Sequence, residues 1–214
     1  MKNEYEDRPY VKAAMAAPHT VMSRDADTLI LYNERADTHI AEGDFQKIVD
    51  VLCNVPMQRL ETSNEAVFRF FEKSGRFKHA QICVQCEHET TAGVAKLFSP
   101  TDGEVRWIAN TYGKPESDVR LMRDERRIFV YRENETAVGY VGIHVDGSVG
   151  LLYVSPEHRR KGYAAAAENE LFKIAPEPVF AQILADNEAS VRLHEKNGWK
   201  FSGYKIHWLF NESF

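Results

Sequence analysis

The spacing of hydrophobic and polar residues in the C-terminal half of the chain predicts a run of strands. Residues 127–132, 137–145 and 149–154 are rich in β-branched and aromatic side chains, as strands are. A Glu-Asn-Glu tripeptide and an Asp-Gly pair lie between these runs, and both form turns readily. We therefore expect three consecutive antiparallel strands.

Helical periodicity is found on both sides of these strands. Residues 104–112 and 116–124 predict two helices, separated by a Gly-Lys-Pro sequence that breaks the pattern. Downstream, the pattern predicts a helix over 164–174, a strand over 178–185 and a helix over 188–196. The C-terminal half is thus expected to read helix, helix, three strands, helix, strand, helix and a last strand.

The N-terminal part carries a weaker version of this order. A helix is expected at 44–52 and a strand at 79–86. Residues 64–75 repeat residues 187–198 without a gap, with Asn, Glu, Ala, Arg, Glu, Lys and Gly at the same places. Amphipathic helices that end in Lys-x-Gly are common, so coincidence is one explanation. We favour the other, a degenerate second copy.

These patterns divide the chain into three segments. Residues 1–20 are expected to form a tail or a short helix, because only the alanine-rich stretch near residue 15 favours a helix. Residues 21–91 are expected to form an N-terminal α/β lobe. Residues 92–214 are expected to form the main domain.

The junction between residues 150 and 164 carries the clearest chemical signal. An apolar strand ends there, a basic turn follows, and a helix begins. Arg159, Gly162 and Ala164 make an Arg-x-x-Gly-x-Ala sequence whose small residues let backbone amides approach a phosphate. The helix N-terminus adds unpaired N–H groups and partial positive charge, which favour an anion. The alternative is a solvated surface turn.

Two other phosphate motifs do not fit this turn. A Walker loop needs Gly-Lys-Ser or Gly-Lys-Thr, but Tyr163 follows Gly162 here. A dinucleotide-binding turn needs three spaced glycines, and this turn has one.

The turn resembles the acyl-CoA signature of the GCN5-related N-acetyltransferase (GNAT) superfamily. A later element, with Asn187, Ser190, Leu193, Gly198 and Trp199, is similar to the superfamily's second motif. The resemblance implies an α/β (α+β) GNAT fold: a mixed, mostly antiparallel central sheet flanked by helices. The N-terminal lobe would be a degenerate half-repeat of it. The FR47-like branch, which resembles glycine N-acyltransferases, has a similar layout.

The resemblance also implies roles for individual residues. The Val154 amide would donate to the acyl oxygen, and His194, which stands where the superfamily often has Tyr, would give a proton to the leaving thiolate. Tyr204 and Tyr153 are alternatives for that proton. The residues implied to bind acyl-CoA are Leu152, Tyr153, Val154, Arg159, Arg160, Lys161, Gly162, Tyr163, Ala164, Asn187 and Ser190.

The general base is left open. Some family members carry a glutamate on the strand before the turn, but the matching position here is Ser148, which cannot accept the proton. A water relay or a base from the N-terminal half would serve. The equivalent turn in that half, residues 41–44, is acidic, so the N-terminal lobe is expected not to bind CoA.

Composition limits the partners. Lys plus Arg number 27 against 32 Asp plus Glu, a net charge of −5 that argues against nucleic acid. No apolar run could span a membrane and the acidic N-terminus is unlike a secretion signal, so a cytoplasmic location is expected.

Cys83 and Cys86 are three apart in a predicted strand and should face opposite sides, which favours two packed thiols over a metal site.

The resemblance therefore implies an N-acyltransferase that uses acyl-CoA, with acetyl-CoA as the expected donor, and transfers the acyl group directly to an amine. The acceptor would be a small molecule or a protein amino group, and the protein a monomer or a homodimer. The alternative is a CoA-binding sensor that has lost catalysis, since the usual Tyr is missing.

Overall fold

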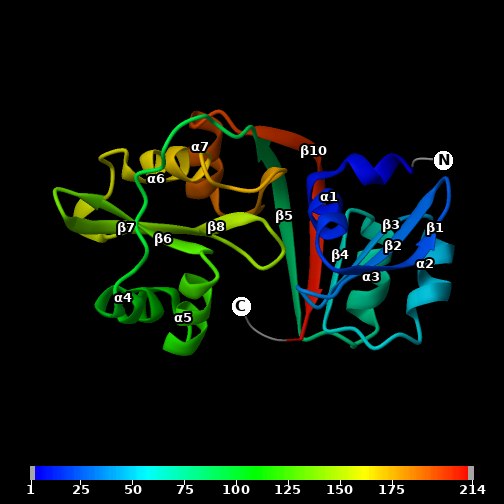
Figure 1. Cartoon of the computed structure of the whole chain (residues 1–214). Helices are drawn as coiled ribbons and strands as arrows, with labels where there is room; N and C mark the ends of the chain where they lie inside the picture. Colours follow the sequence, from blue (N-terminus) through cyan, green and yellow to red (C-terminus); the bar gives the residue numbers. More distant parts are fainter. Residues whose placement is uncertain (1–2, 212–214) are drawn as a thin grey trace.

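Two halves of the chain lie side by side and share one sheet (Figure 1). The computed structural model describes residues 3–211. Among these residues, no helix is long and apolar enough to cross a membrane.

The N-terminal half begins with a short helix that belongs to the core. Pro9 starts α1, where its missing N–H costs nothing, and Tyr10, Val11 and Ala14 are buried. The expected tail or short helix is thus a packed helix. The elements of this half are η1 (Glu4–Asp7), α1 (Pro9–Ala16), β1 (His19–Arg24), β2 (Thr28–Asn33), β3 (Thr38–Gly43), α2 (Phe45–Leu52), β4 (Arg59–Thr62), α3 (Glu65–Lys73) and β5 (His79–His88).

The C-terminal half follows the predicted order closely. Its elements are α4 (Asp102–Tyr112), α5 (Glu116–Asp124), β6 (Ile128–Glu133), β7 (Thr136–Ile143), β8 (Val149–Val154), η2 (Pro156–His158), α6 (Tyr163–Leu171), β9 (Val179–Leu184), α7 (Glu188–Lys196) and β10 (Lys200–Phe210). Residues before α4 make only one bridge, Phe98 with Val130. Gly147 takes a left-handed conformation at φ +93°, as the predicted Asp-Gly turn requires.

The strands form two sheets. One has seven strands in the order β1-β2-β3-β4-β10-β5-β9, and the other has three, β6-β7-β8. All neighbours are antiparallel except β3 and β4. The expected mixed, mostly antiparallel arrangement with flanking helices is confirmed.

The two halves exchange strands in the middle of the large sheet. β5, from the N-terminal half, lies between β9 and β10 of the C-terminal half. In return, β10 pairs with β4 of the N-terminal half. Figure 1 shows β5 and β10 side by side at the junction of the two halves. Neither half therefore has a complete sheet of its own.

Each half contains three antiparallel strands followed by helix, strand, helix and strand. Helices α3 and α7 lie in the two segments that share a repeated sequence, residues 64–75 and 187–198, and their ends have the same structure. Asn64 and Asn187 cap their N-termini through side-chain oxygens, and Gly75 and Gly198 follow their C-termini at φ +69° and +83°. The repeated sequence thus produces the same capped helix twice.

The shared sheet has a hydrophobic core on each face. Cys83 packs with Tyr10 and Leu29 beneath α1, whereas Cys86 packs with Leu171 and Phe172 beneath α6. The two thiols are buried on opposite faces, as expected for residues three apart in a strand. No His, Cys, Asp and Glu cluster able to hold a metal occurs between residues 3 and 211.

Candidate active site

Strand β8 leaves the regular ladder at a bulge. Leu151 and Leu152 together face the single residue Val141 of β7, and the register shifts there. Leu151 has φ +58°, which an L-residue adopts at a cost of about 1 kcal/mol. An extra residue of this kind bends the strand and increases its twist. β8 is also the edge of its sheet, and no ladder joins it to β9 over the described residues.

The bulge leaves a specific amide on that open edge. Ser155 N–H donates to the Val138 carbonyl at 3.0 Å, so Ser155 and Val138 form a hydrogen-bonded pair. Because pairs alternate along an antiparallel ladder, the N–H and C=O of Val154 point away from β7. Leu152 lies in the bulge itself, where this alternation is interrupted. The Val154 amide therefore faces away from β7, on the open edge of β8.

The turn after β8, residues 155–162, forms a cradle at the start of α6. Arg160 and Gly162 both take left-handed conformations, at φ +65° and +88°, and Gly162 is the N-cap of α6. No side chain caps this N-terminus, so its first N–H groups face outward. A Cβ on Gly162 would meet no atom within 4 Å. The space over the glycine is open to a phosphate, which fits the predicted anion site.

The cationic residues of the cradle turn are exposed. Arg159 Nε donates to the Val154 carbonyl at 3.0 Å, and its guanidinium lies 5.8 Å from the centre of the Tyr153 ring. Arg159 thus ties the turn back to the end of β8. Arg160 and Lys161 are exposed to solvent, where their charge attracts anions.

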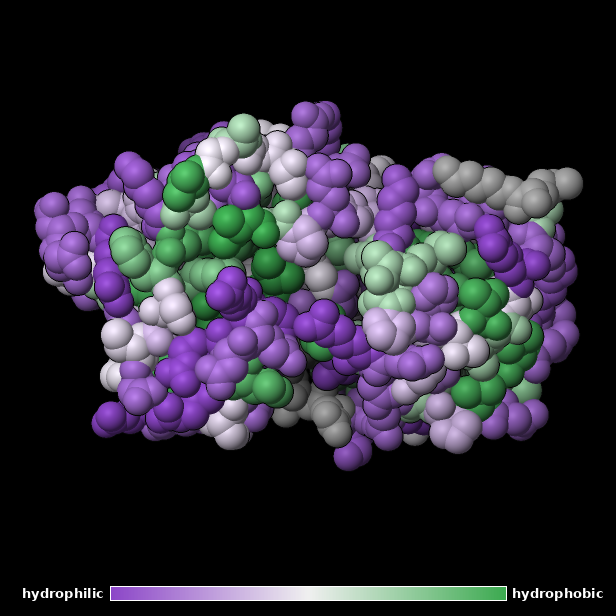
Figure 2. All heavy atoms as spheres, in the orientation of Figure 1, coloured by the Kyte–Doolittle hydropathy of each residue, from purple (hydrophilic) through white to green (hydrophobic). Residues whose placement is uncertain are grey.

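The other predicted acyl-CoA residues lie at the starts of the two helices. Tyr163 and Ala164 begin α6 and are half-buried. Asn187 is exposed and accepts from the Ser190 N–H at 3.2 Å, so its capping role is confirmed. Figure 2 shows hydrophobic side chains gathered on the surface over the β6–β8 sheet. Contact of these residues with acyl-CoA stays a prediction.

His194 lies in the packed interface between α6 and α7. It is only 5% exposed and stands beside Trp199. Its Nε2 is 3.1 Å from Glu168 Oε1 and its Nδ1 is 2.8 Å from the Ser190 carbonyl. Both ring nitrogens therefore lie against protein groups, and Nδ1 is the one with a hydrogen-bond partner. This geometry favours a structural role, and the proton-donor role stays a prediction.

The two tyrosines considered in its place also have structural contacts. Tyr153 stacks on Tyr140 with ring centres 5.1 Å apart. The Tyr204 hydroxyl accepts from Gln85 Nε2 at 2.9 Å, and the Arg8 guanidinium lies over its ring. Tyr153 lies next to the Val154 amide on β8, whereas Tyr204 is on β10.

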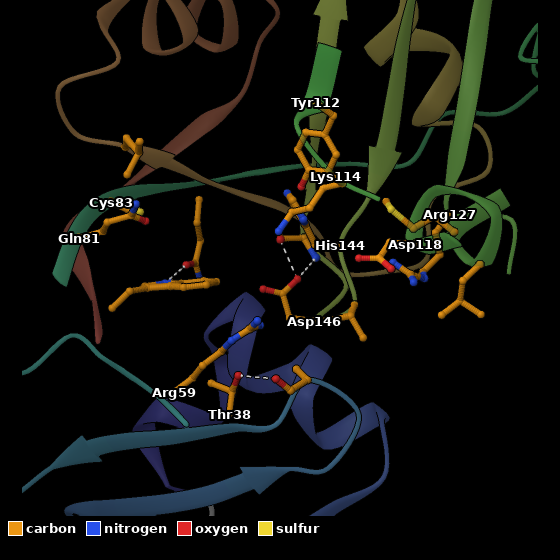
Figure 3. A pocket seen from close by; sticks show the side chains of 18 residues that line it. Thr38, Arg59, Gln81, Cys83, Tyr112, Lys114, Asp118, Arg127, His144 and Asp146 are labelled. Atoms are coloured by element: carbon orange, nitrogen blue, oxygen red, sulfur yellow. Dashed lines mark hydrogen bonds between the residues drawn. The ribbon is translucent and has the colours of Figure 1, made fainter. Parts of the chain in front are cut away.

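A cavity of about 470 Å³ lies between the two halves (Figure 3). Its walls come from β3 and β4, from helix α5 and the turn before it, from the hairpin between β7 and β8, and from the central strands. The hairpin leads directly into β8, so this interlobe cavity lies at the beginning of the strand whose end forms the cradle turn. Its volume suits a small molecule or an extended side chain.

Charged groups of both signs line the interlobe cavity. Arg59, Lys114 and Arg127 supply positive charge, and Asp118 and Asp146 supply negative charge. Figure 3 shows His144 and Asp146 between Lys114 on one side and Arg59 on the other. A cavity with this lining suits a polar, charged ligand rather than a purely apolar one.

His144 is the residue of the cavity that the sequence analysis did not single out. A lone histidine after a strand gives no signal, because its importance depends on which distant residues surround it. Burial lowers its pKa, Asp146 opposes this, and Arg127, Arg59 and Lys114 lower it further. The imidazole is therefore favoured in its neutral form, which can accept a proton.

Cys83 also lines the cavity, but burial raises its pKa to about 12. A thiol attacks as its thiolate, so Cys83 is a poor nucleophile. Ser148, where a base could have stood, instead donates through its N–H and hydroxyl to Asp146 Oδ1 at 2.9 and 2.7 Å. It fixes the orientation of the Asp146 carboxylate.

Three solved structures have the same fold as this chain. A Drosophila protein is 12% identical with a TM-score of 0.61 over 86% of this chain and 74% of its own. A conserved Staphylococcus epidermidis protein of unknown function is 14% identical with a TM-score of 0.57 over 99% of each. A GCN5-related N-acetyltransferase from Kribbella flavida is 13% identical with a TM-score of 0.55 over 95% of this chain and 93% of its own.

Family comparison agrees with the fold. No curated protein matches the sequence. The profile of the acetyltransferase (GNAT) family matches residues 94–199, a range that includes the bulged β8, the cradle turn and α7. The resemblance found in the sequence is thus confirmed at the level of the superfamily, without a particular branch. Residues 94–199 thus form a GNAT acetyltransferase domain.

Proposed function

We propose that the protein is an acyl-CoA-dependent N-acyltransferase that uses acetyl-CoA as donor and an amine as acceptor. The observation that carries the proposal is the continuity of β8 with the cradle turn. An outward Val154 amide on a bulged, unpaired strand edge leads into an uncapped helix N-terminus with open space over Gly162. Such a surface offers donors to a thioester carbonyl and to a pyrophosphate along one line.

Different groups of the chain would bind different parts of the two substrates. The N–H groups at the start of α6, with Arg160 and Lys161, would hold the pyrophosphate. The open edge of β8 would pair with the amides of the pantetheine arm, and the Leu152 and Val154 amides would donate to the acyl oxygen. The acceptor would enter through the interlobe cavity at the start of the same strand.

Direct transfer fits the cavity better than a covalent intermediate. Attack by a cysteine would need a thiolate, and the pKa of Cys83 at about 12 keeps this thiol protonated near neutral pH. The acceptor amine would therefore attack the thioester while both substrates are bound.

The N-terminal half lacks the features that support a second acyl-CoA site. There β3 and β4 are joined in parallel, Thr38–Ile40 against Arg59–Glu61, which closes the gap that stays open between β8 and β9. The turn after β3 is closed too, because a Cβ on Gly43 would lie 1.9 Å from the Asp27 carbonyl oxygen. We propose that this half binds no CoA, so that one chain binds one molecule.

Calorimetry with acetyl-CoA and CoA tests the binding part of the proposal. Wild-type protein should bind one molecule per chain. Gly162→Glu should weaken binding by about 100-fold or more, about 2.8 kcal/mol, because a carboxylate would occupy the place of a phosphate. Gly75→Glu is the matched control, since Gly75 also has a positive φ and open space around it. Equal loss in both variants would contradict the proposal.

Turnover separates an enzyme from a sensor. Thioester consumption is measured with acetyl-CoA and a panel of amino acids, polyamines, aromatic amines and peptides. Transfer to any amine that is lost in Gly162→Glu supports the enzyme. Tight CoA binding without transfer to any acceptor would favour the sensor.

A further inference from the structure

His144 occupies a distinctive position in the interlobe cavity. It follows the last residue of β7 and forms the β7–β8 hairpin through backbone hydrogen bonds to Ser148 and Gly147. Its imidazole lines the cavity, and neither ring nitrogen is hydrogen-bonded to another residue of the described part of the chain. The hairpin thus fixes the position of the ring, and the ring nitrogens can form hydrogen bonds to a ligand in the cavity.

The ring is placed by a glycine on the next strand. A Cβ on Gly150 would lie 2.3 Å from His144 Nε2 and 2.7 Å from its Cδ2, distances that no real contact allows. The imidazole therefore lies directly over the backbone of β8, in space that only a glycine leaves. Any side chain at position 150 would push the ring away.

This position puts the ring within reach of the acyl group. Gly150 is two residues before Leu152, and because the chain is bulged at Leu151 the two are at most about 7 Å apart. An amine nitrogen hydrogen-bonded to Nε2 would lie close to a carbonyl held by the Leu152 amide. The Val154 amide is four residues away, about 13 Å. Along the strand, the ring is thus nearer to Leu152 than to Val154.

The groups around the ring come from every element packed against it. They are Asp146 from its own hairpin, Arg127 from the start of β6, Arg59 from β4 and Lys114 from the α4–α5 turn. Three cations and one carboxylate favour the neutral imidazole.

We propose that His144 is the general base that takes a proton from the acceptor amine, an inference that rests on the proposed function. The acceptor enters as R–NH₃⁺ and gives one proton to the imidazole. The nitrogen lone pair forms the C–N bond as the C–S bond breaks, and the sulfur leaves with its electron pair. The sulfur takes the second proton of the nitrogen, and the imidazolium releases its proton to solvent.

Two pairs of variants test this role, each assayed with the best amine from the panel. His144→Gln should lower kcat/KM at pH 7 by about 100-fold to 1000-fold, the usual size of a lost general base. Acetyl-CoA affinity should not change. His79→Gln, an exposed histidine on β5, is the control and should keep wild-type activity. Activity of His144→Gln should recover as pH rises toward the pKa of the acceptor amine.

The second pair moves the ring without removing it. Gly150→Ala should displace the imidazole and lower kcat/KM, whereas Gly103→Ala, on α4 with no atom within 4 Å of the added Cβ, should not.

The choice of acceptor gives a further test of the His144→Gln variant. An aromatic amine is already neutral at pH 7, so the substitution should lower kcat/KM less with an aromatic amine than with an alkylamine.

The outcomes separate the two proposals. If His144→Gln transfers acetyl groups at the wild-type rate, or keeps the wild-type pH profile, His144 is not the general base. The proposed N-acyltransferase activity would still stand. If wild-type protein consumes no acetyl-CoA with any amine, the proposed function fails and the role of His144 fails with it.

Discussion

At the scale of single residues, two buried carboxylates differ in how well they are compensated. Glu42 accepts hydrogen bonds from the Tyr10 hydroxyl, from the Ser63 N–H and hydroxyl, and from Arg8, at 2.5 to 2.7 Å. Glu61 accepts from the Gln182 amide. Burial raises the pKa of both carboxyls, and for Glu61 the nearby Asp146 raises it further. Glu61 is therefore the group that prefers to keep its proton.

Glu61→Gln should flatten the pH dependence of stability. The folded protein binds the Glu61 proton more tightly than the unfolded chain, whose pKa is about 4.3. Stability is therefore lost as pH rises from that value through the folded pKa. The neutral amide removes this loss, so the variant should gain about 1–3 kcal/mol over wild type at pH 8 and little at pH 4. Urea unfolding between pH 4 and pH 8 measures the difference.

The exposed Glu34 provides the comparison for this effect. Glu34→Gln changes the same chemical group in solvent and should track wild type across the pH range. If Glu61→Gln tracks wild type as well, the carboxyl of Glu61 is ionised in the folded protein at no cost, and the argument from burial is wrong.

His194→Leu separates a structural histidine from a catalytic one. The substitution removes the imidazole beside the buried Glu168 and leaves the Asn197 amide as a donor to its carboxylate, which should cost about 1–3 kcal/mol in urea unfolding at pH 7. The kcat of the folded fraction should stay within about 3-fold of wild type. A drop of 100-fold or more with acetyl-CoA affinity unchanged would instead favour the proton-donor role.

His194 and His144 show which properties of a single residue could be predicted from the sequence and which could not. The motif in the sequence located α7 and its cap, because those depend on neighbouring residues. It did not reveal that His194 faces Glu168 on another helix. Nor did it draw attention to His144, whose surroundings come from four separate segments. Local sequence predicts which helix or strand carries a residue. The residues that contact its side chain depend on tertiary packing.

At the scale of elements, strands and helices were predictable but strand pairing was not. The apolar run at 149–154 predicted β8 with its correct bounds. It gave no sign of the bulge, since Leu151 and Leu152 are both good strand residues and the register depends on β7. β1, β2 and β3 were expected only as part of an α/β lobe. The exchange of β5 and β10 joins residues more than 100 positions apart, beyond any local pattern.

This exchange predicts that the halves stay together when the chain is cut. Residues 89–94 are exposed and lie outside the helices and strands, so a protease site can be inserted there. After cleavage, the fragments should elute together on gel filtration, because β5 remains paired with β9 and β10. They should separate only in denaturant. Two fragments that elute separately and fold alone would contradict a shared sheet.

At the scale of the whole molecule, the two halves share an order of elements but differ in shape. The C-terminal half keeps an open strand edge and an open turn, whereas both are closed in the N-terminal half. The interlobe cavity needs both, since Thr38 and Arg59 come from one half and His144 and Asp146 from the other. Under the proposed function, the closed half would contribute walls for the acceptor, and the open half would bind the donor.

Narrowing the cavity should therefore affect the acceptor alone. Leu184 lines the cavity at the end of β9 and is 38% exposed, so Leu184→Trp adds bulk without disturbing the core. The KM for the acceptor amine should rise about 10-fold, about 1.4 kcal/mol of lost binding, while acetyl-CoA affinity stays constant. Val94→Trp is the control, because Val94 is 88% exposed and is not among the residues lining the cavity. If Leu184→Trp weakens acetyl-CoA binding and leaves the acceptor KM unchanged, the donor rather than the acceptor occupies the space between the halves.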